Sequence, residues 1–305
     1  MTRLPERDEI AAQIAALMRG FSIEVTPREL DTIGAIEDLL PVGTPVFITW
    51  LPNAGFERTV AAARRITDAG LVPVPHLAAR AIRSEQELDD VVGAAVEQAG
   101  VRRVLAIAGS VAETAGPFPA TIDLLRTGVM ERHGIAWVGV AGHPEGSPDV
   151  GDAELVQAIT DKNAFAAESG LDVHLFTQFC FAAEPVVIWE RSIRAAGNVL
   201  PVHVGLPGAA SAATLVKFGL RCGVGPSLAV MRKRAGSVLK LASAKPQYPE
   251  ATVAGVAAAV AEDGESRFAP FHFFPFGAFA RTAAWARALA DGRFAMPADD
   301  RLVVD

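Results

Sequence analysis

The stretch Leu175-Phe176-Thr177-Gln178-Phe179 has the composition of a buried strand and ends in one uncharged amide. Continuous apolar runs of this kind are typical of parallel sheets, whose strands are buried on both faces. A glutamine at the tip of such a strand can read the donor and acceptor edge of a flat heterocycle. Elsewhere in the chain, apolar runs also end in one polar residue, namely Glu24, Thr49, His76, His143 and His203. This repetition indicates that the strand ends form one shared site.

Eight apolar runs are predicted to be strands, and helical periodicity fills the segments between them. The strands are Phe21–Val25, Val46–Trp50, Leu71–His76, Arg103–Ala108, Ala136–Ala141, Val173–Phe179, Val202–Leu206 and Pro270–Phe274. The helices include Phe56–Ala69, Glu85–Ala99, Ala120–Arg132, Ala153–Ser169, Val186–Ala196 and Ala209–Gly219. Eight strand–helix units match a (β/α)8 TIM barrel, which usually has about 250 residues. A doubly wound sheet is the alternative, but its first turn is normally rich in glycine, and Thr26-Pro27 follows the first strand here.

Two segments exceed the minimal barrel. Arg7–Arg19 has helical spacing and is predicted to plug the bottom of the barrel or to begin an interface. Ser227–Asp263 is predicted to hold two further helices before the eighth strand. We see no linker or low-complexity run, so we expect a single α/β domain over residues 1–305. Residues 1–20 would be its helical extension and residues 293–305 its tail.

The composition excludes several classes of function. The chain has 305 residues, half of them hydrophobic, and a net charge of -7, which gives no electrostatic reason to expect nucleic acid or an anionic membrane as partner. Its two cysteines, Cys180 and Cys222, lie in apolar segments and are expected to be reduced thiols. The charged N-terminus and the absence of an apolar run of about 18 residues predict a soluble cytoplasmic protein.

Glu24 is the main candidate for acid–base chemistry. It follows Phe21-Ser22-Ile23, so the strand would carry a carboxyl group into apolar surroundings. Loss of hydration there would raise its pKa and suit it to act as a general acid. The alternative, to which we give equal weight, is a carboxylate paired with a nearby arginine.

The histidines fall into two groups. His143 lies in a turn-rich loop directly after the fifth strand, and a loop position favours contact with a ligand over packing. His76, which follows Pro73-Val74-Pro75, His203, within its strand, and His272, among four phenylalanines, are more typical of structural groups.

Metal binding and serine nucleophile chemistry have no support in the sequence. The six histidines are scattered without His-x-x-x-His spacing, and Cys-x-x-Cys and Gly-x-Ser-x-Gly are absent. The glycine-rich turn Cys222–Ser227 falls where many barrels hold a phosphate, but it lacks the lysine and spacing of a P-loop. These absences favour a mouth that holds a large flat ligand or a redox cofactor.

A set of short motifs, in this order and spacing, resembles the methylenetetrahydrofolate reductase family. The motifs are Phe21-Ser22-Ile23-Glu24, Pro75-His76-Leu77, His143-Pro144-Glu145 and Thr177-Gln178-Phe179. The resemblance covers roughly residues 20 to 280. It implies a (β/α)8 flavoprotein that transfers a hydride from NAD(P)H, through FAD, to 5,10-methylenetetrahydrofolate and releases 5-methyltetrahydrofolate.

The resemblance also assigns roles to single residues. Glu24 takes the place of the family's glutamate, which supplies the proton that opens the methylene bridge to an iminium. Gln178 takes the place of the glutamine that hydrogen-bonds the pterin edge. Thr49 and His76 fall where the family contacts the flavin, and His143 falls in the loop near the adenosine side of the flavin.

Three departures from the family pattern concern the cofactor. The fourth strand of the family typically ends in Arg-Gly-Asp beside the flavin, whereas Ala108, Gly109 and Ser110 take that place here. The family lysine near the flavin phosphates aligns with Ala164–Ala167, and Lys162 lies one turn earlier. Small residues around Ala209–Ala213 replace an aromatic residue expected after the seventh strand. Loss of a charge beside the flavin would change its potential and its binding.

Other readings of the site follow from these departures. A flavin-free reductase would transfer the hydride directly from the nicotinamide. A demethylase-type enzyme would keep the tetrahydrofolate site and accept a methyl or one-carbon unit from a small donor. A binding module without turnover is a third reading, and Glu24 argues against it, because a binder has little use for an isolated acid. The family resemblance further implies a homo-oligomer.

Overall fold

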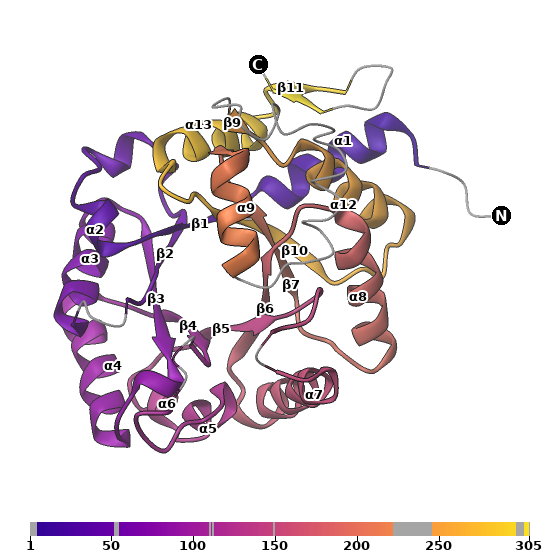
Figure 1. Ribbon diagram of the computed structural model, residues 1–305. Coiled ribbons are helices and arrows are strands. Elements are labelled where there is room, and N and C mark those ends of the chain that lie inside the picture. Colours follow the sequence, from indigo (N-terminus) through magenta and orange to yellow (C-terminus); the bar gives the residue numbers. More distant parts are fainter. Residues whose placement is uncertain are drawn as a thin grey trace. The chain divides into compact units, whose positions relative to one another are not determined.

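The protein is described here by a computed structural model that covers residues 5–51, 55–109, 111, 113–148, 150–221, 246–296 and 302–304. Eight strands form a closed barrel in the order β1-β10-β7-β6-β5-β4-β3-β2 (Figure 1). They are β1 (Ser22–Val25), β2 (Pro45–Ile48), β3 (Val72–Ala78), β4 (Arg103–Ile107), β5 (Trp137–Gly142), β6 (Asp172–Phe179), β7 (Val202–Pro207) and β10 (Phe268–Phe274). The predicted (β/α)8 fold and its eight strands are therefore confirmed.

Helices lie between these strands, and most of them agree with the predicted ranges. They are α1 (Arg7–Met18), α2 (Pro27–Leu30), α3 (Phe56–Asp68), α4 (Glu85–Ala99), α5 (Thr121–Leu125), α6 (Val129–Arg132), α7 (Asp152–Ser169), α8 (Ala183–Ala195), α9 (Ala212–Arg221), α12 (Glu250–Glu262) and α13 (Phe279–Ala290), with single 3-10 turns η1 (Ile36–Asp38) and η2 (Ala79–Ala81). The prediction of one helix over Ala120–Arg132 was wrong. Gly128 has φ +71°, a left-handed conformation that interrupts the helix and separates α5 from α6.

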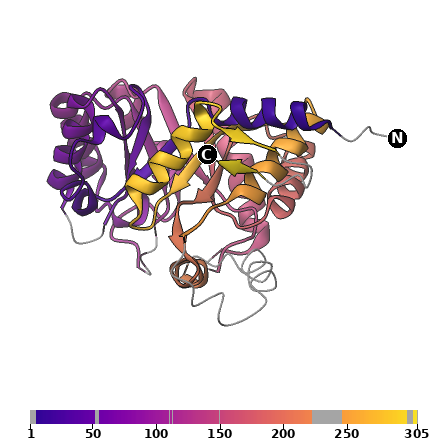
Figure 2. The same ribbon diagram turned by 90° about the horizontal axis from the view of Figure 1, so that it is seen from above.

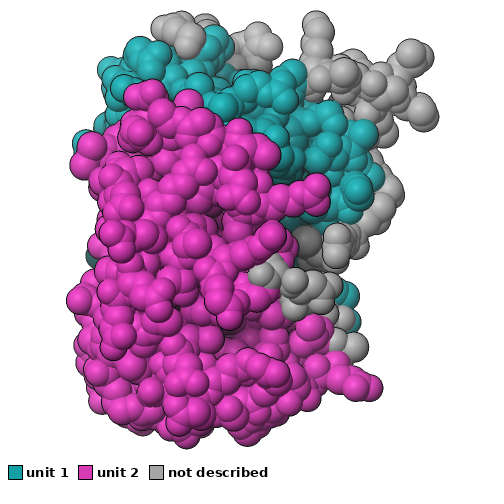
Figure 3. All heavy atoms as spheres, turned by 90° about the vertical axis from the view of Figure 1, so that its left-hand side faces the viewer, with its two compact units in different colours: residues 1–23, 142–157, 176–305 teal, residues 24–141, 158–175 magenta. Residues whose placement is uncertain are grey.

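Contacts between Cα atoms group the residues into two compact units (Figure 3). One unit contains Met1–Ile23, Gly142–Gln157 and Phe176–Asp305, and we call it the first unit. The second unit contains Glu24–Ala141 and Ala158–Leu175. Each is described by itself below, and the organisation of residues 1–305 as one domain stays a prediction.

The second unit contains β2 to β5 with α3 and α4 packed side by side outside them (Figures 1 and 2). The start of α4 follows from its sequence. The Ser84 hydroxyl accepts a hydrogen bond from the Glu87 backbone N–H, as in a capping box. The Glu87 carboxylate accepts from the Arg83 backbone N–H instead of that of Ser84, so half of a capping box is present. Gly100, with φ +65°, ends the helix.

The first unit contains β7, β10 and the helices α1, α8, α12 and α13. Helix α1 packs on α12, α13 and β10 through Ile14, Leu17 and Met18 (Figure 2). Phe271 and Phe273 of β10 are fully buried. The extra N-terminal helix thus covers elements of its own unit. Of the two predicted helices in Ser227–Asp263, α12 is present, and residues 222–245 lie outside the described residues.

Four two-residue strands form two short antiparallel pairs in the same unit. β8 (Ala210–Ser211) pairs with β9 (Pro246–Gln247), and β11 (Phe294–Ala295) pairs with β12 (Val303–Val304). The predicted tail after residue 292 therefore has local structure. No helix in the described part of the chain is both long and apolar enough to cross a bilayer.

A buried carboxylate ties α8 to the segment that enters β10. Glu190 is 1% exposed and accepts hydrogen bonds from Arg194 Nε at 3.0 Å and from the Arg267 backbone N–H at 3.0 Å. Arg194 also pairs with Asp263. A buried charge is tolerated only when it is paired and hydrogen-bonded in this way.

We expect Glu190→Ala to lower the free energy of unfolding by about 3–5 kcal/mol, because Arg194 would lose a buried partner and the Arg267 N–H its acceptor. Urea denaturation of the full chain measures this change. Glu262→Ala is the matched control, since Glu262 contacts Arg191 at 3.7 Å on a more exposed surface and should cost under about 1 kcal/mol. Equal effects of the two substitutions would contradict this account of Glu190.

Candidate active site

Glu24, Thr49 and His76 come together in the second unit. The Thr49 hydroxyl donates a hydrogen bond to Glu24 Oε2 at 3.2 Å. The other carboxyl oxygen, Oε1, lies 3.4 Å from His76 Nε2. The side chains of Glu24 and His76 are 13% and 6% exposed, so this carboxyl group is largely removed from bulk water. Two of the contacts of this carboxyl group are thus with a hydroxyl and an imidazole.

The parallel strands explain why these three residues meet. The Thr49 backbone N–H donates to Val25 O at 2.9 Å, which sets the end of β1 against the residue after β2. In the next pair, Ile48 of β2 is in register with Pro75 of β3. Glu24, Thr49 and His76 each stand within one residue of these pairings. Their meeting is therefore a consequence of register at the carboxyl ends of three neighbouring strands.

His76 approaches Glu24 without a well-aligned hydrogen bond. The 3.4 Å separation is within ion-pair distance, but Nε2 is buried and its geometry does not meet that of a hydrogen bond. The imidazole and the carboxyl group are therefore neighbours, and a small movement would bring them into hydrogen-bond geometry. The edge-on ring of Phe47, 6.2 Å away between centroids, packs against the imidazole and limits its rotation.

The end of β4 carries no charge in the described residues. Ala108 O accepts a hydrogen bond from the Arg80 backbone N–H at 3.0 Å. Gly109 has φ +88°, and a Cβ atom there would lie 3.1 Å from the Ala78 side chain. The left-handed conformation therefore favours glycine here, and an added Cβ atom would crowd Ala78. Ser110, the third residue predicted at this corner, lies outside the described residues.

Gln178 lies in the first unit, on β6. Its backbone carbonyl accepts from the Thr177 hydroxyl at 2.7 Å and from the Cys180 thiol at 3.2 Å. The side-chain oxygen Oε1 is buried and has no hydrogen-bond partner. An unpartnered buried acceptor costs roughly 1–3 kcal/mol. A hydrogen-bond donor placed at this oxygen would remove that cost.

Gly205 on β7 allows the backbone of β6 to approach at this point. A Cβ atom at residue 205 would lie 2.6 Å from Thr177 O, 2.7 Å from Gln178 O and 2.7 Å from the Phe274 ring. Two of these neighbours are backbone atoms, which cannot move aside cheaply.

We expect Gly205→Ala to lower the free energy of unfolding by about 1–3 kcal/mol, because the added methyl group must displace β6. The same displacement would move Gln178 and weaken binding at its amide. Thermal denaturation measures the first effect. Gly264→Ala is the control, since no atom lies within 4 Å of a Cβ there, and its unfolding should change by under about 1 kcal/mol. A neutral Gly205→Ala would contradict the close approach.

His143 lies in the first unit, directly after β5. It is half-buried, and its carbonyl accepts from the Gly146 N–H at 3.2 Å, which closes a turn. The structure therefore confirms the predicted position of His143 in the loop after the fifth barrel strand. Its role toward a cofactor stays a prediction. Cys180 is fully buried, as expected of a thiol packed as a small apolar group, and burial raises the pKa of that thiol.

Lys162 of α7 is a buried amine at the end of β5. Its Nζ donates to Ala141 O at 2.7 Å, and burial lowers the pKa of Lys162 to about 8. The ordinary value for a lysine is about 10.4. Between these two pKa values the unfolded chain binds more protons at this site than the folded chain does. This group therefore adds stability as the pH rises through that window.

We expect the free energy of unfolding of the natural chain, relative to Lys162→Met, to rise by about 1–3 kcal/mol between about pH 7.5 and about pH 10. The subtraction cancels the other titrating groups, which both chains share. Urea denaturation at several pH values measures the difference. A difference that stays constant over this window would contradict the lowered pKa.

His203 and His272 are structural, in agreement with the sequence. His203 Nδ1 lies 2.6 Å from Pro270 O, and its ring stacks on Phe176 with 4.3 Å between centroids. His272 Nδ1 lies 2.8 Å from the Ser22 hydroxyl. These contacts use both rings to fill and order the first unit.

Sequence reasoning missed an aromatic cluster around Phe276. Phe276 has φ +51°, an unusual conformation for a residue with a side chain. Its ring stacks on Phe218 of α9 at 4.4 Å and meets Phe179 of β6 edge-on at 4.9 Å. Strained residues of this kind collect at functional sites. The sequence signal was the turn Pro275-Phe276-Gly277 directly after β10. The Phe276 ring therefore lies next to β6 in the first unit. The family has an aromatic residue after its seventh strand, and β7 belongs to the same unit here.

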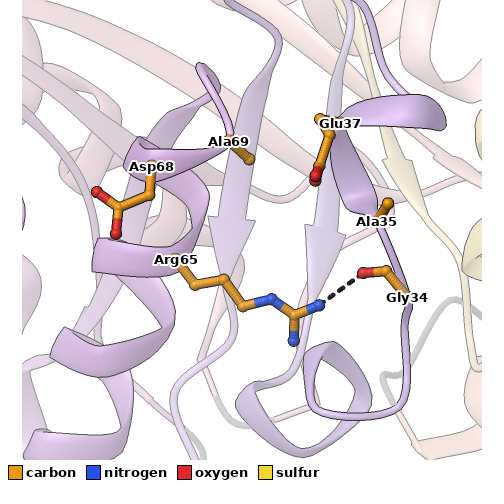
Figure 4. Close-up of a pocket in the computed structure, with 6 residues that line it drawn as sticks. All are labelled: Gly34, Ala35, Glu37, Arg65, Asp68 and Ala69. Atoms are coloured by element: carbon orange, nitrogen blue, oxygen red, sulfur yellow. Dashed lines mark hydrogen bonds between the residues drawn. The ribbon is translucent and has the colours of Figure 1, made fainter.

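A surface hollow of about 240 Å3 lies in the second unit (Figure 4). Its lining residues are Gly34, Ala35, Glu37, Arg65, Asp68 and Ala69. The Arg65 guanidinium donates to the carbonyls of Leu30, Ile33 and Gly34, so it holds the chain after α2. These hydrogen bonds give Arg65 a structural role at the hollow. In the described part of the chain, no three histidine, cysteine or acidic side chains are grouped as metal ligands.

A family comparison identifies the class of protein. The sequence model described as methylenetetrahydrofolate reductase matches residues 26–225, about two thirds of the chain. The chain belongs to this family. Thr49, His76, His143 and Gln178 fall inside the matched range, and Glu24 precedes it by two residues. Membership supports an oxidoreductase with a folate-related one-carbon function.

Solved structures add little to this result. One similar structure is a xylose isomerase-like TIM barrel/4-hydroxyphenylpyruvate dioxygenase fusion protein, which is 15% identical in sequence with a TM-score of 0.35. The match covers 88% of this chain and 42% of the fusion protein. Another is D-psicose 3-epimerase in the presence of D-fructose, which is 12% identical with a TM-score of 0.36. That match covers 90% of this chain and 84% of the epimerase. The chain thus spans less than half of the fusion protein. These scores are too low to inform on the site.

The described residues that are predicted to hold FAD have other contacts in this structure. Ala108 and Gly109 bring no charge to the β4 end. Thr49 donates to Glu24, and His76 faces the same carboxyl group. Lys162, the nearest counterpart of the family lysine, is buried and bonded to Ala141 O. We therefore derive no chemical step through a flavin.

Proposed function

We propose that the protein catalyses the NAD(P)H-dependent reduction of 5,10-methylenetetrahydrofolate to 5-methyltetrahydrofolate. The observation that carries the proposal is the buried Oε1 of Gln178, an acceptor without a donor. A pterin offers ring N–H and amino donors along one edge, and an amide can meet such an edge with an acceptor and donors of its own. Membership in the reductase family supports the choice of a folate over other heterocycles.

Glu24 is the proposed proton donor. Reduction of the one-carbon bridge requires protonation of a bridge nitrogen, so that one C–N bond breaks and an iminium forms to accept the hydride. A carboxyl group suits this role when it is largely dehydrated, because dehydration favours the protonated form. The Thr49 hydroxyl fixes Oε2 and thereby directs the carboxyl group.

The route of the hydride is the finer part of the proposal. If FAD is bound at the residues predicted for it, Thr49, His76 and His143, it would supply a hydride carrier between NAD(P)H and the folate; without a flavin, NAD(P)H would supply the hydride directly. The visible absorbance of the purified protein separates the two, because a flavoprotein is yellow. A colourless protein that oxidises NADH with methylenetetrahydrofolate would support the direct route.

A tetrahydrofolate-dependent methyl or one-carbon transfer enzyme is the second candidate. The uncharged end of β4, with Gly109 in a conformation that excludes a side chain, favours it. Such an enzyme would convert tetrahydrofolate and a methylated small donor without consuming NAD(P)H. Product analysis with and without NAD(P)H distinguishes it from the reductase.

We expect Glu24→Gln to slow the folate reaction by about 10²- to 10⁴-fold, because the amide cannot donate the proton. Oxidation of NADH by menadione, which needs no folate, should persist if the protein carries a flavin. Glu29→Gln on α2 is the matched control and should retain folate turnover. Equal loss of the folate and menadione reactions in Glu24→Gln would mean that Glu24 is structural.

We also place the enzyme in the cytoplasm as a homo-oligomer that binds neither nucleic acid nor membrane. The net charge of -7 supports the absence of an anionic polymer as partner. Light scattering of the purified chain measures the oligomeric state.

A further inference from the structure

A phenylalanine that the proposed function does not use lies beside Gln178 in the first unit. The Phe274 ring of β10 occupies the space over Gly205 of β7. A Cβ atom at residue 205 would lie 2.7 Å from the ring atom Cε2 of Phe274 and 2.7 Å from Gln178 O. The ring and the Gln178 backbone therefore adjoin the same point. Phe274 is only half-buried, so part of its ring is open to a ligand.

The alternation of side chains along the strands explains why the ring and the amide meet. Side chains two residues apart on a strand share a face, and the inward faces of a (β/α)8 barrel fill its interior in layers. Phe176, His203 and His272 belong to one such layer, because the Phe176 ring stacks on His203 at 4.3 Å and meets His272 edge-on at 5.2 Å. The three residues of the preceding paragraph stand two positions further along the same three strands. They form the next layer, closer to the carboxyl ends of β6, β7 and β10.

Further rings lie around Phe274 at this end of the strands. Phe179 of β6 meets it edge-on at 5.8 Å, and Phe276 lies nearly parallel to it, with 6.2 Å between centroids and 17° between planes. Phe218 of α9 stacks on Phe276 at 4.4 Å. The unusual backbone of Phe276, with φ +51°, places a second half-buried ring beside Phe274.

One polar acceptor beside several apolar rings favours a particular kind of ligand. Ligand pockets are mostly apolar and contain a few polar groups that fix the orientation of the ligand. Phenyl rings pack on other flat rings, offset or edge-on, with about 4.5–7 Å between centroids. Among the described residues, Gln178 Oε1 is buried and meets no donor. The first unit therefore offers an apolar surface for the face of a flat ring and an acceptor for its edge.

We propose that Phe274 is a substrate-binding residue, whose ring packs on the face of the heterocycle that donates to Gln178. The proposal deepens the proposed function and rests on it for the identity of the heterocycle, a pterin. It adds that the face and the edge of the ring are recognised within one unit, by β10 and β6. Phe276, with Phe218 behind it, extends the same apolar surface.

Binding of pterin itself tests the proposal without turnover, because pterin has the flat ring and the donor edge of a folate but no one-carbon bridge. We expect Phe274→Leu to weaken pterin binding about 5- to 100-fold, the range for loss of an aromatic stacking partner. Isothermal titration calorimetry of the full chain measures the affinity. Phe274→Tyr keeps a ring and should restore most of it. Phe294→Leu, at a half-buried ring of β11 in the same unit, is the matched control and should bind pterin as the natural chain does.

An NMR measurement separates contact with the ligand from a structural role. A phenyl ring packed over a heterocycle shifts the protons of that heterocycle upfield. The carbon-bound protons of pterin should therefore move upfield when it binds to the natural chain. At saturation, Gln178→Leu should retain this shift despite weaker binding, whereas Phe274→Leu should lose most of it.

Two results would overturn the proposal. One is a pterin affinity in Phe274→Leu equal to that of the natural chain. The other is a loss of affinity in Phe274→Leu with an unchanged upfield shift, which would mean that Phe274 only supports the fold around the site. Phe274→Met replaces Phe274→Leu if the leucine variant does not fold, and the same results apply to it.

Failure of the proposed function would look different. If the natural chain turns over no folate but binds pterin with the expected dependence on Phe274, the reductase proposal fails and the ring contact stands. If the natural chain reduces methylenetetrahydrofolate, and Phe274→Leu changes neither its KM nor the pterin affinity, the inference fails alone. A natural chain that binds no pterin would overturn the inference whatever its activity.

Discussion

A strand buried on both faces can present a polar side chain cheaply only at its end, and the rest of this structure depends on that constraint. Within a strand, a charged or amide group would need a partner in the core. At the carboxyl ends of β1, β2 and β3, register alone sets Glu24, Thr49 and His76 together. The Thr49 hydroxyl donates to Glu24 and the His76 imidazole lies beside the same carboxyl group, so three segments far apart in sequence meet at one place.

The fold was predictable because the signals were local and repeated. Apolar runs predicted all eight strands, and helical periodicity predicted α4 with the bounds that it has. The helix predicted over Ala120–Arg132 was wrong because Gly128 adopts a left-handed conformation that periodicity does not encode. The candidate site was predicted in part. Glu24 and Gln178 were recognised as strand-end groups, but the His76 contact depends on register, and the strain at Phe276 depends on its backbone.

The residues proposed to meet the folate and the residues predicted to hold the cofactor differ in their contacts. Gln178 offers a buried acceptor and Glu24 a shielded carboxyl group, and both survive in a chain whose β4 end has lost its charge. The groups that could have served a flavin have internal partners instead. Lys162 is bonded to the end of β5, and Thr49 and His76 are turned to Glu24.

The most direct measurement is a crystal structure of the full chain with bound 5-methyltetrahydrofolate. The account predicts that the pterin edge donates a hydrogen bond to Gln178 Oε1. It also predicts that the nitrogen released from the one-carbon bridge faces the Glu24 carboxyl group. A folate bound elsewhere, with the Gln178 oxygen still without a donor, would contradict it.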